Sequence, residues 1–119
     1  METRAFPFGL MQFLQDKPDI LIVLTKNGFG CAGAKIRFLH NDYTLSVQWC
    51  GINNYCSAEP LIGHPVFTEQ SDDAEFAIWD GDGVWHTEEF YGDSVVGYAD
   101  LASVISAFNL LSNMNKEGA

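Results

Sequence analysis

The segment Asp80-Gly81-Asp82-Gly83, with Glu89 after it, has the spacing most suggestive of bound-ion chemistry. Asp80 and Asp82 would take the third and fifth positions of a calcium-binding loop, and Glu89 would take the bidentate position. The first ligand would then be Ile78, which cannot bind a cation. We therefore interpret the segment as a tight turn with an anionic tip. A cation site at Asp80, Asp82 and Glu89 remains an alternative.

Two further groups of residues match cofactor or metal patterns only in part. Residues 28–33 (GFGCAG) have the glycine spacing of a dinucleotide-binding loop, but the residues that follow alternate like a strand and do not open a helix. Cys50, Cys56 and His64 lack the spacing of common zinc sites. Cys31 has no local group that would activate its thiol. We expect no cofactor and no metal.

Adjacent carboxylates occur at Asp72-Asp73 and at Glu88-Glu89. Neighbouring residues on a strand point to opposite faces, so neither pair forms a general acid and base by itself. The three histidines are scattered along the sequence and have no nucleophile at a recognisable spacing. The residues therefore predict a protein that is not an enzyme.

Acidic residues dominate the chain from residue 38 to residue 115, which contains no lysine or arginine and twelve aspartates and glutamates. The net charge is −10. Such a surface repels nucleic acid and most membranes and attracts basic partners. Nine of the acids fall between residues 69 and 93, with Trp85 and Tyr91 among them as candidate interface anchors. These nine are Glu69, Asp72, Asp73, Glu75, Asp80, Asp82, Glu88, Glu89 and Asp93. The alternative is a solvated face that only keeps the protein in solution.

The hydrophobic pattern predicts one α+β domain over residues 1–119. An apolar face at helical spacing predicts a helix over residues 6–14, and a second helix follows Asp100 up to Leu111. Between the helices we expect an antiparallel sheet of about five strands, with both helices on one face. It combines a three-stranded meander (residues 20–25, 34–40 and 43–50) with a hairpin (residues 75–79 and 84–87). The first strand is continuously apolar, and we expect it to be central and covered on both faces.

The cellular context follows from two absences in the sequence. No apolar stretch is long enough to cross a bilayer, and the N-terminal residues do not form a signal peptide. Three cysteines are an odd number, which argues against a secreted disulfide framework. We expect a cytoplasmic protein that does not bind membranes.

The general profile is small, acidic, single-domain and without a catalytic signature. In this it resembles phage-encoded inhibitors of bacterial defence, such as anti-CRISPR and anti-restriction proteins. The resemblance implies that the acidic face imitates nucleic-acid phosphates and blocks the basic groove of a nucleic-acid-binding protein. One alternative is a small ligand- or metal-binding domain that uses residues 51–70 as a lid. Another is a homodimer that buries exposed aromatics such as Trp49 and Tyr55.

Overall fold

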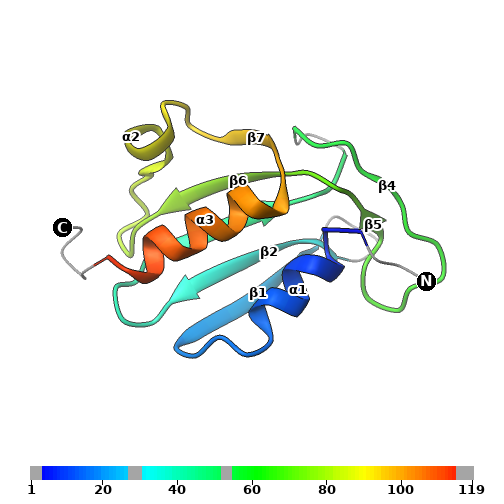
Figure 1. Ribbon diagram of the computed structural model, residues 1–119, viewed down its shortest axis with the longest axis horizontal. Helices are drawn as coiled ribbons and strands as arrows, with labels where there is room; N and C mark the ends of the chain where they lie inside the picture. Colours follow the sequence, from blue (N-terminus) through cyan, green and yellow to red (C-terminus); the bar gives the residue numbers. More distant parts are fainter. Residues whose placement is uncertain (1–3, 27–30, 52–54, 115–119) are drawn as a thin grey trace.

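The computed structural model describes residues 4–26, 31–51 and 55–114 of the chain. These residues form a five-stranded antiparallel sheet in the order β1-β2-β3-β6-β7, a short two-stranded sheet and three helices (Figure 1). The predicted α+β class and the five-stranded antiparallel sheet are confirmed. The main sheet contains β1 (Ile20–Lys26), β2 (Cys31–Phe38), β3 (Thr44–Gln48), β6 (Ala74–Trp79) and β7 (Val96–Ala99). The small sheet pairs β4 (Glu59–Pro60) with β5 (Glu69–Gln70), and the helices are α1 (Phe8–Leu14), α2 (Thr87–Tyr91) and α3 (Leu101–Ser112).

The predicted meander of β1, β2 and β3 is confirmed. The alternation of apolar and polar residues places the apolar side chains on one buried face of the sheet. In β2 the side chain of Ile36 is buried, whereas those of Lys35 and Arg37 are exposed. Ile36 pairs with Ile22 on one side and with Leu45 on the other, so that apolar side chains form a row across the sheet. This register fixes which face of the sheet receives the helices.

Helices α1 and α3 cover that buried face together, as predicted (Figure 1). The Asp100 carboxylate accepts the backbone N–H of Ser103 at 2.8 Å and caps α3. Phe108 of α3 packs against Phe38 of β2 and Phe13, with ring centroids 4.9 Å and 5.1 Å apart. The two helices and the sheet therefore share one core. No helix among the described residues is long and apolar enough to cross a membrane.

The prediction that the first strand is central was wrong. β1 lies at the end of the sheet, and its Leu21 and Val23 side chains are 49% and 53% exposed. The core-facing Ile22 is partly buried. A continuous apolar run shows that a strand is favoured but does not show how many of its faces are covered, and here the helices cover only one.

The second strand of the predicted hairpin was also wrong. Residues 84–86 make a single bridge, between Trp85 and Trp79, and α2 then begins at Thr87. The buried Thr87 hydroxyl accepts the Ile78 N–H at 2.8 Å and donates to the Ile78 carbonyl at 3.3 Å. The hydrogen bonds of the Thr87 side chain thus replace further backbone pairing between this segment and β6. The fifth strand is instead β7, for which the sequence predicted no element.

The long connection after β3 contains the small β4–β5 sheet and runs beside the core. Trp49, expected to be exposed and available to a homodimer, is fully buried within the single chain. Its ring packs against Phe6 and Phe67, with centroids 6.1 Å and 6.0 Å away. Trp49 continues the inward-facing positions of β3, which explains its burial. Tyr55, in contrast, is 58% exposed.

Candidate functional site

The nine acidic residues do not form one continuous face. Glu69, Asp72 and Asp73 precede β6, whereas Asp80, Asp82, Glu88 and Glu89 follow it. Because a six-residue strand extends about 17–20 Å, the two groups lie at opposite ends of β6 (Figure 1). The remaining two are Glu75 within β6 and Asp93 after α2.

The carboxylates that precede β6 are used within the protein. Arg4 bridges Glu59 and Asp72, with N–O distances of 2.9 Å and 3.1 Å. Asp73 accepts the backbone N–H of Ser57 at 2.5 Å. Glu69 accepts the backbone N–H of Gly51 at 3.0 Å. Because these carboxylates tie down the N-terminal segment and the long connection, they have a structural role in the fold.

Asp80 organises the turn after β6 and joins it to α2. Its Oδ1 accepts the backbone N–H groups of Asp82 and Val84 at 2.9 Å and 3.0 Å. Its Oδ2 lies 2.8 Å from Nε2 of His86, and Nδ1 of the same ring lies 3.2 Å from Glu89 Oε1. The hydrogen bond to Asp80 raises the pKa of His86, and the same contact lowers the pKa of Asp80. His86 is the centre of this group, but its role has no signal in the sequence because it depends on a helix, α2, that the pattern of residues does not predict.

This geometry does not favour the cation site considered for Asp80, Asp82 and Glu89. Asp80 and Glu89 contact opposite nitrogens of one imidazole ring. Within the described part of the chain, no three His, Cys, Asp or Glu residues are grouped as metal ligands would be.

The cysteine and glycine motifs also have structural roles where they are described. The Cys56 thiol donates to the Cys50 carbonyl at 3.1 Å, and burial raises its pKa to about 11. His64 Nδ1 accepts the backbone N–H groups of Val66 and Phe67 at 3.1 Å and 3.0 Å. Gly33 lies inside β2, where no helix begins, and residues 28–30 of the glycine-rich segment lie outside the described residues.

The segment from residue 82 to residue 93 presents exposed carboxylates beside exposed apolar side chains. Val84, Trp85 and Tyr91 are 55%, 54% and 38% exposed. Asp82, Glu88 and Asp93 are exposed and make no ion pair with any residue that the structure describes. We call the exposed residues of this segment the α2 edge. It consists of Asp82, Val84, Trp85, Glu88, Glu89, Tyr91 and Asp93.

The two aromatic residues of the α2 edge lie toward opposite faces of the sheet. Trp85 stacks on Trp79, with centroids 5.5 Å apart, and Tyr91 meets Phe76 edge-on at 5.3 Å. Phe76 belongs to the core face of β6, and Trp79, three residues on, points to the other face. The α2 edge therefore extends around the side of β6 from one face of the sheet toward the other.

Glu75 is not part of the α2 edge. It is half-buried on the face of β6 opposite the helices, and its carboxylate accepts the backbone N–H of Tyr55. Burial raises the pKa of this carboxyl group. Glu75 therefore fixes the backbone at Tyr55 and does not present its charge freely to a partner.

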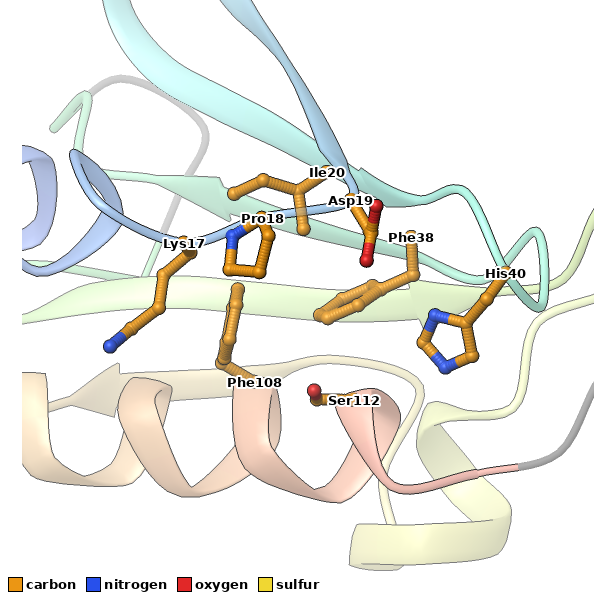
Figure 2. Close-up of a pocket in the computed structure, with 8 residues that line it drawn as sticks. All are labelled: Lys17, Pro18, Asp19, Ile20, Phe38, His40, Phe108 and Ser112. Carbon is orange, nitrogen blue, oxygen red and sulfur yellow. The ribbon is translucent and has the colours of Figure 1, made fainter.

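A small hollow lies where β1 begins and α3 ends, on the β1 side of the sheet (Figure 2). Its volume is about 210 Å³, below the roughly 300–1,000 Å³ of most ligand pockets. The Phe38 and Phe108 rings line its interior, and Lys17 and His40 lie at its ends (Figure 2). Lys17 Nζ lies 3.7 Å from the Asp16 carboxylate. The small-ligand alternative expects residues 51–70 to act as a lid, but none of these residues and no member of the predicted acidic set lines this hollow.

Comparison of the chain with protein families, with curated proteins and with solved structures finds no match.

Proposed function

We propose that this protein is a non-enzymatic binding protein whose α2 edge inserts into a basic groove on another protein. One observation carries the proposal. Trp85 is exposed within a stretch of sequence, residues 38 to 115, that has twelve acidic residues and no lysine or arginine, and Lys35 of β2 lies 5.7 Å from the ring of Trp79, on which Trp85 stacks. Ordinary surfaces intersperse both signs of charge, whereas binding surfaces combine an aromatic anchor with a polar rim.

The placement of the two aromatic rings of the α2 edge supports a groove as its partner. Trp85 and Tyr91 lie toward opposite faces of the sheet, so a flat partner could not contact both rings. A groove could enclose the α2 edge and contact both aromatic residues, while its basic walls meet Glu88 and Glu89. Basic grooves are typical of nucleic-acid-binding proteins, which attract phosphates in the same way. We therefore propose that the partner is a nucleic-acid-binding protein and that the α2 edge competes with its nucleic acid.

Inhibition of a host defence system, of the anti-CRISPR or anti-restriction kind, is the biological role that this competition would serve. A cytoplasmic location would follow from such a role. The carboxylates before β6 are already used by Arg4 and by loop backbone, so the proposed mimic is smaller than nine residues and is centred on α2.

Affinity capture from a lysate of the cells in which the protein acts tests the proposal. The variant Asp82→Asn/Glu88→Gln removes two charges from the α2 edge, and Asp16→Asn/Asp19→Asn removes two from the segment before β1, at the opposite edge of the sheet. We expect wild type and the Asp16/Asp19 control to capture the same basic protein at low salt, and to lose it at raised salt. We expect the α2 variant to capture it weakly, and added DNA or RNA to compete with wild type. Equal capture by all three proteins, or capture unaffected by nucleic acid, would contradict the proposal.

A further inference from the structure

Two exposed tyrosines form the sides of a surface hollow next to the α2 edge. Tyr55 and Tyr98 are 58% and 63% exposed, and both line a hollow of about 460 Å³. Their ring centroids are 6.5 Å apart, and their planes meet at 47°. Asp93, which is exposed, also lines the hollow and gives it an acidic residue. We call Tyr55, Tyr98 and Asp93 the tyrosine clasp.

The backbone holds the two tyrosines in this arrangement. The Tyr98 N–H donates to the Tyr55 carbonyl at 2.8 Å. The segment around Tyr55 lies so close to β7 that a Cβ atom at Gly97 would be 2.6 Å from the Cβ of Tyr55, so only glycine fits there. The Glu75 carboxylate accepts the Tyr55 N–H from the neighbouring strand. The tyrosine clasp is therefore fixed by contacts on both sides.

Tyr98 has a φ of 50°, in the left-handed region that bulky residues rarely adopt. Such a conformation persists only where surrounding contacts impose it, and it is concentrated at functional sites. At Tyr98 the unfavourable backbone supports a side chain that remains mostly in solvent. The core does not explain this position, because the ring does not pack into it.

Two aromatic faces beside a carboxylate attract a cation. A cation is held by an aromatic ring when it lies within about 6 Å of the ring centroid. The two centroids are 6.5 Å apart. A cation that is equally far from both rings therefore lies within about 6 Å of each centroid when it is no more than about 5 Å from the midpoint between them. A guanidinium group suits the space over these two rings better than an ammonium group does. It is planar, stacks on aromatic faces and pairs with carboxylates through two N–H groups.

We propose that the tyrosine clasp binds an arginine side chain of the protein partner, with its guanidinium over both tyrosine rings and an N–H group toward Asp93. This inference rests on the proposed function, since the arginine would come from the wall of the same basic groove. Asp93 belongs to both the α2 edge and the tyrosine clasp, so one partner surface could meet the two without a gap.

The test uses the peptide acetyl-Gly-Arg-Gly-amide and its citrulline analogue, which has the same shape without the charge. Each is titrated into the full-length protein while the tyrosine ring resonances are followed by NMR. We expect saturable shifts of the Tyr55 and Tyr98 resonances with the arginine peptide, and binding about tenfold weaker or absent with citrulline. Equal shifts with both peptides would overturn the proposal.

Three variants make the assignment specific. Tyr98→Leu and Asp93→Asn should weaken arginine binding about tenfold, whereas Tyr98→Phe should keep most of it because the ring face is retained. Circular dichroism confirms that each variant is folded. Unchanged arginine binding by folded Tyr98→Leu would also overturn the proposal. The variant Asp82→Asn/Glu88→Gln separates the two proposals. If it still binds the arginine peptide and also captures the same protein as wild type does, the proposed function is overturned, whereas the proposal for the tyrosine clasp stands.

Discussion

His86 Nε2 lies 2.8 Å from Asp80 Oδ2 and joins the turn after β6 to the first residues of α2. The other ring nitrogen of His86 lies 3.2 Å from Glu89. A neutral imidazole has only one N–H donor, so it can donate to only one of these carboxylates, whereas the protonated ring donates to both. The arrangement of the α2 edge therefore depends on the charge of His86.

The stability of the protein should depend on pH through this pair. The pKa of His86 is raised above its ordinary value of 6.5, so its contribution is complete below pH 6.5 and is lost as the pH rises through the raised pKa. The pKa of Asp80 is lowered from 3.8, so its contribution is complete above pH 3.8 and is lost as the pH falls through the lowered pKa. We expect the contact to stabilise the fold most between these two ordinary values. Thermal melts across this range and above it would measure the effect as Tm.

The variant His86→Gln isolates the histidine contribution. We expect its Tm to fall below that of wild type at pH 5.5 and to approach it as the pH rises above the raised pKa of His86. His40→Gln, at an exposed position after β2, is the control and should retain the pH dependence of wild type. A His86→Gln profile parallel to that of wild type would show that the pair contributes no pH dependence.

The Thr87 hydroxyl determines where α2 begins, and its removal should be costly. In Thr87→Val the buried N–H of Ile78 loses its acceptor, which costs about 1–3 kcal/mol of unfolding free energy. Urea denaturation would measure this loss. Thr87→Ser retains the hydroxyl and should recover the part of the loss that comes from the hydrogen bond. If valine and serine behaved alike, the hydroxyl would not be the source of the effect.

Phe108 connects α3 to β2 and to Phe13, so it should be a major contributor to the core. We expect Phe108→Ala to lower the free energy of unfolding by about 3–5 kcal/mol, because it leaves a cavity among buried rings. Leu110→Ala, on the same helix but 38% exposed, should change it by no more than about 0.5 kcal/mol. Equal effects at the two positions in urea denaturation would contradict the packing described.

The sequence was sufficient to predict elements whose pattern depends on one buried face. The alternation of polar and apolar residues over residues 34–40 was enough to predict the strand that becomes β2, and Asp100 marked the start of α3. Both signals are local, so they do not depend on the rest of the fold.

The remaining elements depend on contacts that are distant or unusual. The Asp80 turn suggested a hairpin, but the competing hydrogen bonds of Thr87 to Ile78 ended the pairing and allowed a helix to begin. β7 has a glycine and a left-handed tyrosine, so alternation could not reveal it. Because the Thr87 hydrogen bonds end the pairing, Glu88 and Glu89 stay near Asp80 and do not run back along β6 toward Asp72 and Asp73.

The dissociation constant of the captured partner for the variant Trp85→Ala tests the central claim most directly. Trp85 is the large exposed aromatic on the α2 edge, and Leu39, which is 56% exposed at the end of β2, gives the control Leu39→Ala. If the α2 edge inserts into a groove, Trp85→Ala should weaken binding about 30-fold or more, as expected for an aromatic hot spot worth about 2 kcal/mol, and Leu39→Ala should leave it unchanged. A dissociation constant for folded Trp85→Ala within about twofold of wild type would contradict the claim.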